Sequence, residues 1–271
     1  MWKPLTRDQL EQSRSDFSGE SVEVQCQVMA HDVIIATLGP DFWKRHCTRL
    51  SDKNSYFNPK GETTLELNFH RDCVLRLGDM LYSMRETPGY SHFIHTLGKQ
   101  DLDSAFFELK AAHAFHFNGH PIVFVQRSGT KSEDYDLSST ISDKTTAIEA
   151  KFARSKINDN AATVRNQLSK ARGQLPRDRP GIICLYTQTH IESSENIRST
   201  IDQFLKKETN VTHVILFRDQ FNIDQAGSRV SSVEEMPNLA SRHSVQNKPL
   251  LGVTRVLDFR NPDRGLLPSF W

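Results

Sequence analysis

Residues 134–152 read Asp-Tyr-Asp-Leu-Ser-Ser-Thr-Ile-Ser-Asp-Lys-Thr-Thr-Ala-Ile-Glu-Ala-Lys-Phe and contain the clearest fold signal in the chain. It contains two strand-like runs, Tyr135–Thr140 and Thr145–Phe152, joined by the short polar segment 141–144. Two such runs around a short turn predict a β-hairpin. The rest of the fold is predicted by working outward from this hairpin.

The segments on either side alternate between helical and strand-like patterns. An apolar helix and a short β-branched run precede the hairpin, and helices alternate with buried strands after it. The order α-β-β-β-α-β-α-β predicts an α/β fold, a mixed sheet with helices on both faces. The expected flanking elements are the helix Asp103–Phe117, the strand Pro121–Gln126, the helix Ala161–Leu175, the strand Gly181–Tyr186, the helix Glu195–Lys206 and the strand Val211–Phe217.

The two ends of the chain have weaker patterns. Residues 1–100 are expected to form an N-terminal mixed α/β extension: 63–69 alternate like a half-buried strand, and Cys73–Arg85 has helical spacing. Residues 101–218 form the predicted core. Residues 219–271 are expected to complete the domain with a polar loop up to Asn247 and a strand over Leu250–Phe259.

Composition limits the class of protein. Of the 271 residues, 37% are hydrophobic and 25% charged, which excludes a mostly disordered chain. The net charge of +1 means that a nucleic-acid partner requires a local basic patch. Four widely spaced cysteines match no zinc motif, and the chain has neither a secretory signal nor an apolar run long enough to span a membrane. We therefore expect a soluble cytoplasmic protein with no membrane partner.

The hairpin gathers side chains suited to metal binding. Side chains alternate along a strand, so Glu149 and Lys151 are expected on one face, opposite the apolar packing of their neighbours. Asp134 and Asp136 share a face of the preceding strand, and the hairpin can bring one of them beside Glu149. Carboxylate oxygens are the ligands that Mg²⁺ prefers, and a lysine beside them can steady a water nucleophile or the charge on a phosphate.

This constellation resembles the PD-(D/E)xK phosphodiesterase superfamily, which includes restriction endonucleases, Holliday-junction resolvases and RecB-type nucleases. The resemblance covers about 103–217 and implies a restriction endonuclease-like core, αβββαβ, flanked by helices. Glu149-Ala150-Lys151 matches the family's acid-x-lysine motif. Asp136 matches the upstream aspartate best, with Asp134 as the close competitor, and the proline of the family name is absent.

The resemblance also implies a role for each matched residue. Asp136, Glu149 and the Ala150 carbonyl would bind Mg²⁺, with Mn²⁺ as an alternative, and Lys151 would position the attacking water. Glu108 matches the family's helical acid and would take part in metal binding or orient Lys151. Gln174 matches the glutamine found on the following helix, and Gln167 lies two turns earlier on the same face. The implied activity is a metal-dependent nuclease, a DNA endonuclease in the first instance.

A basic segment follows the motif. Residues 151–179 contain eight basic residues against two acidic ones, which suits contact with a nucleic-acid backbone but also occurs on solvated helix faces. We expect DNA as the partner, and RNA would be bound by the same charges. The predicted nucleic-acid-binding residues are Arg154, Lys156, Arg165, Lys170 and Arg172.

Other interpretations remain open. The chain could be a catalytically weak or silent nucleic-acid-binding or protein-interaction module of the same fold. It could instead act as a homodimer, or as a subunit of a larger nuclease complex of a defence system or mobile element. His113, His116 and His120 lie close enough in sequence to suggest zinc, but no cysteine or paired carboxylate completes a tetrahedral set.

Overall fold

The fold is described from a computed structural model of the chain. The description covers residues 5–47, 64–97, 101–130, 133–153, 161–187, 194–221, 229–243 and 249–251. The chain divides into two compact units. The described residues of the first unit lie within 5–86 and 93–106, and those of the second lie within 87–92 and 107–251.

The regular secondary structure described in the first unit is all helical, so the mixed α/β prediction for residues 1–100 is wrong for the described residues. Residues 64–69, expected as a strand, form the start of a long helix, because a helix already formed by the following turns extends at little cost. No helix in the described part of the chain is long and apolar enough to cross a membrane. The helices up to residue 97 are α1 (Arg7–Asp16), α2 (Val22–Leu38), α3 (Pro40–Phe42), the π-helix η1 (Trp43–Cys47), α4 (Thr64–Ser83) and α5 (Tyr90–Leu97).

Local signals explain where these helices begin and end. Thr6 and Gln9 form a capping box at the start of α1, and the Ser21 side chain caps α2 by accepting from Val24 N. Gly39 ends α2 with a φ of 87°, a conformation that favours glycine.

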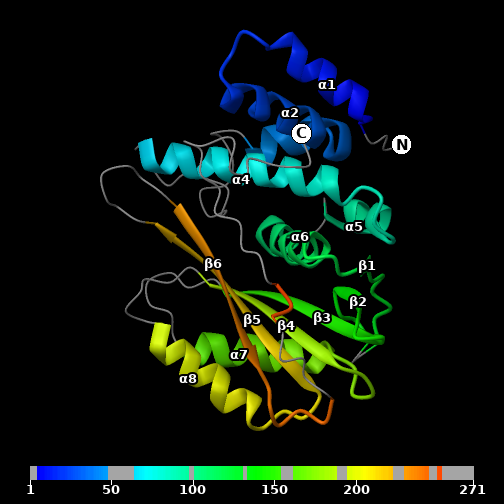
Figure 1. Ribbon diagram of the computed structural model, residues 1–271, viewed down its shortest axis with the longest axis vertical. Helices are drawn as coiled ribbons and strands as arrows, with labels where there is room; N and C mark the ends of the chain where they lie inside the picture. The colour runs from blue at the N-terminus through cyan, green and yellow to red at the C-terminus, as the bar shows by residue number, and fades with distance from the viewer. Residues whose placement is uncertain are drawn as a thin grey trace. The chain divides into compact units, whose positions relative to one another are not determined.

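The second unit contains a six-stranded mixed sheet in the order β1-β2-β3-β4-β5-β6 (Figure 1). The first three strands pair antiparallel, β3, β4 and β5 pair parallel, and β6 pairs antiparallel with β5. This arrangement confirms the predicted α/β class. The strands are β1 (Ile122–Phe124), β2 (Leu137–Ile141), β3 (Lys144–Ala153), β4 (Gly181–Thr187), β5 (Val211–Phe221) and β6 (Arg229–Pro237).

The predicted hairpin is β2–β3. Its two-residue turn, Ser142-Asp143, has φ values of 50° and 62°, the left-handed pair that matches the twist of the strands it joins. The parallel strands that follow are connected by helices, as the predicted alternation requires. These helices are α7 (Ala161–Gln174) and α8 (Ser194–Leu205).

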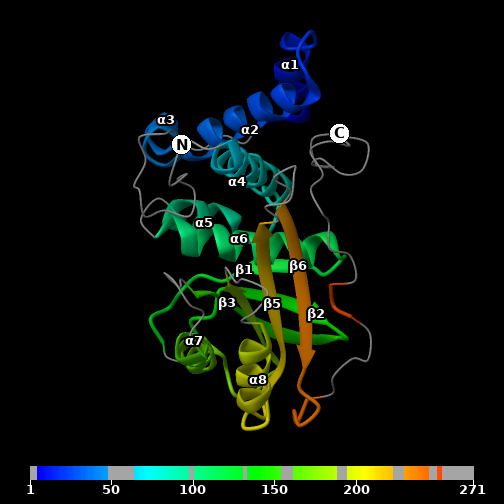
Figure 2. The same ribbon diagram turned by 90° about the vertical axis from the view of Figure 1, so that its left-hand side faces the viewer.

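The two faces of the sheet are covered by different helices. α7 and α8 pack against one face, where Val164 and Leu168 meet Ile183 and Leu185 in a single buried cluster (Figures 1 and 2). The other face carries Tyr186, whose ring lies 5.2 Å from that of Phe107 on α6 (Leu102–Phe117). Alternate residues of β4 therefore belong to opposite cores.

The C-terminal prediction is partly wrong. Residues 229–237, expected within a loop, form β6 and pair with β5 along their whole length. Their polar composition suits an edge strand, whose outer side has no apolar neighbour to pack against. Leu250 and Leu251 are buried but form no strand, and the remainder of the predicted strand lies outside the described residues.

Candidate active site

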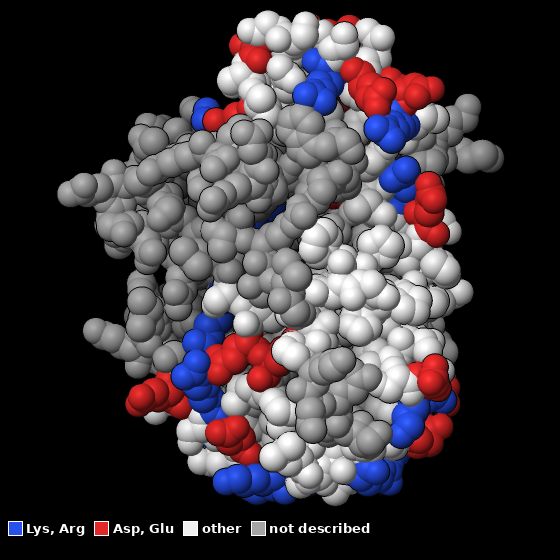
Figure 3. All heavy atoms as spheres, in the orientation of Figure 1, with Lys and Arg blue, Asp and Glu red and all other residues white. Residues whose placement is uncertain are grey.

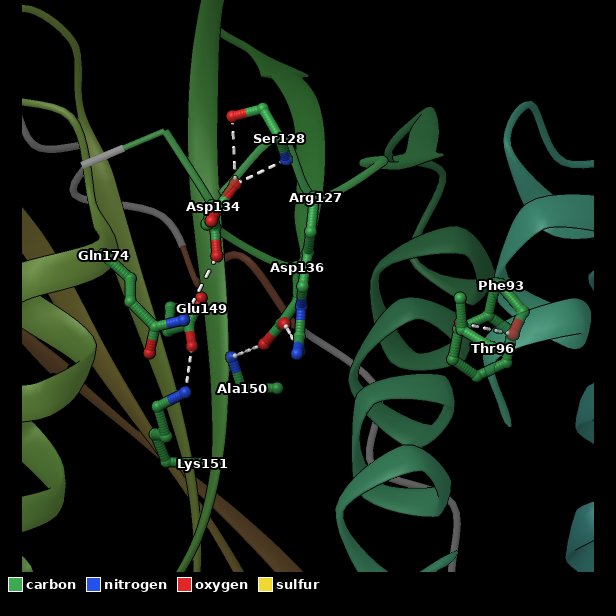
Figure 4. Close-up of polar contacts among 10 residues, drawn as sticks. All are labelled: Phe93, Thr96, Arg127, Ser128, Asp134, Asp136, Glu149, Ala150, Lys151 and Gln174. Atoms are coloured by element: carbon green, nitrogen blue, oxygen red, sulfur yellow. Dashed lines mark hydrogen bonds and ion pairs between the residues drawn. The ribbon is translucent and has the colours of Figure 1, made fainter. Parts of the chain in front are cut away.

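The candidate site lies where β2 and β3 separate. The two strands are paired from Ile141↔Lys144 to Leu137↔Ile148, and Asp136 comes directly before this ladder. Ala150 N donates a hydrogen bond to Asp136 Oδ2 at 2.9 Å, so the Asp136 carboxylate lies against β3 (Figure 4). The end of the hairpin thus brings Asp136 next to the Glu149-Ala150-Lys151 motif.

Glu149 and Lys151 share one face of β3, as the alternation predicts. The Lys151 ammonium donates to Glu149 Oε1. This face is not a polar surface, however: Glu149 is fully buried, and the neighbouring residues Ala147 and Ala153 belong to the core beneath α7 and α8. The expectation that apolar packing lies only on the opposite face is therefore wrong, because helices cover both faces of β3.

The second oxygen of Glu149 is unsatisfied. Glu149 Oε2 is buried and accepts no hydrogen bond from the described part of the chain. Burial, and next the nearby Asp136 charge, raise the pKa of Glu149 to about 8, while Lys151 acts in the opposite direction. The nearby positive charge of Lys151 therefore does not offset the effect of burial, and the pKa of Glu149 stays above its ordinary value.

Glu108 on α6 belongs to the same electrostatic cluster. Its side chain is buried, and burial followed by the charges of Asp136 and Glu149 holds the pKa of this carboxyl well above its usual range. Arg127 and Lys151 oppose that shift. Three acids from a helix, a loop end and a strand therefore lie within electrostatic reach of one another, and their charges add to the effect of burial on Glu108 and Glu149.

The sequence prediction missed Arg127. Its Nη2 donates to Asp136 Oδ1 at 2.9 Å, and its side chain is half exposed. β1 pairs with β2, and the pairing continues beyond the strands as a bond from Val125 N to Asp136 O at 3.0 Å. Continuation of the β1–β2 register would place Val125 opposite Asp136 and Arg127 opposite Asp134, so it brings this arginine to within two positions of Asp136 without selecting it as the partner.

Asp134 has a different role from Asp136. Its carboxylate accepts from Ser128 N at 2.6 Å, from Ser128 Oγ at 3.1 Å and from Gly129 N at 3.0 Å. These bonds hold the turn that follows Arg127. Of the two aspartates that the sequence leaves open, the structure brings Asp136 to Glu149 and uses Asp134 in the turn.

Gln174 reaches the same segment from α7. Its side-chain amide donates to the Asp134 carbonyl at 3.1 Å (Figure 4). Gln174 therefore connects α7 to the chain that enters β2, two residues before Asp136. Gln167 lies earlier on α7 and is half-buried.

The predicted basic residues divide into three groups. Arg154 and Lys156 lie outside the described residues, whereas Arg165 and Lys170 are exposed on α7. Arg172 pairs with Glu208 at 2.6 Å. In Figure 3 the described Lys and Arg side chains alternate with Asp and Glu over the lower part of the view. The face seen there has no uninterrupted basic field among the described residues.

The three histidines do not converge. His120 Nε2 hydrogen-bonds Leu250 O at 2.8 Å, His113 packs near the Phe117 ring at 6.3 Å, and His116 is exposed. Among the described residues no group of three or more His, Cys, Asp or Glu side chains could hold a metal ion. The set inferred from the sequence is smaller: two carboxylates and the Ala150 carbonyl.

The residues present nevertheless suit a hard divalent cation. Asp136 and Glu149 supply oxygen, and Glu149 Oε2 is an orphaned buried acceptor. Mg²⁺ is commonly held by one or two carboxylates together with waters and substrate phosphate, so a larger protein cage is not required. A cation here would also offset the repulsion that raises the pKa of Glu108 and Glu149.

Comparison with protein-family models, with curated proteins and with solved structures finds no match to the chain. The fold and the site together describe a mixed α/β unit with a carboxylate–lysine cluster at the open end of the β2–β3 hairpin.

Proposed function

We propose that the protein is a Mg²⁺-dependent nuclease that hydrolyses phosphodiester bonds, with DNA as its substrate. The observation that supports this most is the meeting of Asp136, Glu149 and Lys151 at the open end of the β2–β3 hairpin, where Glu149 Oε2 lacks a partner. The resemblance to the PD-(D/E)xK superfamily assigns the same three residues to this chemistry.

In this proposal each residue has a stated task. Asp136, Glu149 and the Ala150 carbonyl hold the cation, for which Mn²⁺ can substitute. When bound, the cation polarises a phosphoryl oxygen and lowers the pKa of a water. Lys151 keeps its ammonium beside Glu149, where it can orient a water or offset charge on the phosphate. Glu108 lies within electrostatic reach of Asp136, Glu149 and Lys151, where it would take part in metal binding or orient Lys151.

The substrate proposal depends on the exposed cations. Arg165 and Lys170 on α7 are available to a nucleic-acid backbone, with Arg154 and Lys156 between β3 and α7 in the chain. Contacts of this kind position a backbone without reading its sequence. Arg172 already pairs with Glu208, so in this proposal it contributes less to nucleic-acid binding than Arg165 or Lys170.

The test is cleavage of plasmid and single-stranded DNA in Mg²⁺, Mn²⁺ or EDTA. Wild type is compared with Glu149→Gln, which keeps the shape of the side chain and removes its charge, and with the exposed control Glu133→Gln. We expect cation-dependent cutting by wild type and Glu133→Gln only. Equal cutting by Glu149→Gln would contradict the assignment of the site.

A second candidate is a silent nucleic-acid-binding module of the same fold. The observation that favours it is the Asp136 carboxylate, which already accepts hydrogen bonds from Arg127 and from Ala150 N. A folded wild-type protein that binds DNA, cuts no substrate and shows no thermal shift with Mg²⁺ or Mn²⁺ would establish this candidate instead. Activity that appears only with further subunits would point to a nuclease complex.

We also propose a cytoplasmic location. Cys26, Cys47 and Cys184 are free and buried, and burial raises the pKa of Cys26 to about 11 and of Cys47 to about 12. Free thiols of this kind suit a reducing compartment. Cell fractionation with a tagged chain tests the location directly.

A further inference from the structure

Arg127 has a feature that the proposed function leaves unexplained. Its guanidinium donates to Asp136 Oδ1 at 2.9 Å, which places a cation on a carboxylate assigned to the metal. The Asp136 side chain is 3% exposed, whereas that of Arg127 is 50% exposed. The pair therefore joins a buried acid to a cation that reaches solvent.

The backbone around Arg127 is fixed on both sides. Before it, Val125 N donates to Asp136 O at 3.0 Å. After it, Ser128 N and Gly129 N donate to the Asp134 carboxylate at 2.6 and 3.0 Å. The base of the arginine is therefore held beside the site, and a change in its contacts requires only rotation of its long side chain.

Charge explains why such a change would accompany metal binding. Arg127 interacts electrostatically with Glu108 and Glu149 as well as with Asp136, and Lys151 is bonded to Glu149. A bound divalent cation would favour the ionised form of all three carboxylates. If both side-chain cations then stayed in place, the cluster would carry one excess positive charge, whereas departure of the guanidinium would bring it to neutrality.

We propose that Arg127 occupies Asp136 in the metal-free protein and moves to a backbone phosphate of the nucleic acid when a divalent cation takes its place. The inference rests on the proposed function. A guanidinium suits both positions, because its planar set of donors matches a carboxylate and a phosphate equally well. Metal binding and nucleic-acid binding are then linked through one side chain.

The first test measures metal affinity without DNA. Mn²⁺ is titrated into full-length wild type, Arg127→Ala and Arg198→Ala, and free Mn²⁺ is followed by electron paramagnetic resonance. Arg198 is a matched control, since its side chain is 52% exposed and pairs with Glu234 at 2.6 Å. We expect the Kd for Mn²⁺ to fall at least about threefold in Arg127→Ala only, because a competing cation is removed.

The second test separates exchange of partners from simple loss of positive charge. Binding of a labelled DNA duplex is measured in EDTA and in Ca²⁺. Arg127→Ala should weaken binding by about tenfold in Ca²⁺, where the arginine is released to the phosphate, and by less than about twofold in EDTA. Arg198→Ala should match wild type in both buffers.

The outcomes distinguish this inference from the proposed function. Wild type that binds Mn²⁺ and cuts DNA, with an unchanged Kd in Arg127→Ala or equal losses in EDTA and Ca²⁺, would overturn the role of Arg127 alone. Mn²⁺ binding by Arg127→Ala but not by wild type would support the arginine as the occupant of the site. If neither binds Mn²⁺, both proposals fail. If Arg127→Ala does not fold, Arg127→Gln replaces it in both tests.

Discussion

Buried acids occur in both units of the molecule, but their surroundings differ. In the helical unit, Asp72 is 3% exposed and both of its oxygens accept from Arg76 Nε, one turn along α4. In the sheet unit, Glu108, Asp136 and Glu149 come from separate elements and share two cations, and Glu149 Oε2 has no partner.

The difference separates structural from chemical use of a buried charge. A buried acid paired with an arginine on the same helix has a local partner for its charge, and removal of that partner destabilises the fold because it leaves a buried charge uncompensated. A cluster with more acids than cations costs stability when ionised, and such clusters are typical of functional sites. Four experiments test whether the two regions differ in this way.

The largest effect is expected from Lys151→Ala. Removal of the ammonium beside Glu149 should lower DNA cleavage by about 10³-fold or more, because the charge that offsets the phosphate is lost. Lys144→Ala, an exposed change at the other end of β3, is the control for cleavage and folding. Retained cleavage in folded Lys151→Ala would contradict the assignment of the acid cluster in the sheet unit as the cleavage site.

The reverse pattern is expected for Arg76→Ala. Loss of this arginine removes the paired cation from buried Asp72 and should lower the free energy of unfolding by about 3 kcal/mol in urea denaturation. Cleavage per folded molecule should not change. The exposed pair Arg7–Glu11 is also an i,i+4 pair, so Arg7→Ala should leave the urea midpoint near that of wild type.

A smaller effect concerns pH. Glu149 binds its proton more tightly in the folded state, with a pKa of about 8 against an ordinary 4.5, so its contribution makes stability fall as pH rises between those values. In EDTA, Glu149→Gln should reduce that fall between pH 5 and 8 by roughly 1–2 kcal/mol. Exposed Glu11→Gln should preserve it. An unchanged slope in Glu149→Gln would contradict the strained state of this carboxyl.

The smallest effect is expected from Gln174→Ala. The lost hydrogen bond to the Asp134 carbonyl is worth about 1 kcal/mol, and the segment entering β2 loses one anchor. Cleavage should fall by less than about tenfold, since Asp136 keeps its bond from Ala150 N. A loss as large as that of Lys151→Ala would instead place Gln174 in contact with the reacting groups.

Features of the fold that depend on short-range interactions can be predicted from the sequence, whereas features that depend on contacts between distant segments cannot. The hairpin, the helices and the buried strands of 102–217 were predicted to within a few residues, because period and turn residues are local signals. β6 was missed because its polar residues form a strand only by pairing with β5. The start of α4 differs from the predicted strand because the alternating pattern over 63–69 does not reveal the helix that continues after it.

The α/β order of the second unit and the shared face of Glu149 and Lys151 can be predicted from local periodicity, which distinguishes helices from strands and alternates side chains along a strand. The rest of the cluster depends on contacts between separate elements. These contacts place Asp136 rather than Asp134 beside Glu149, bring Arg127 to Asp136, and bury Glu149 beneath α7. These contacts depend on how strands and helices distant in sequence pack together, and no local periodicity specifies that packing.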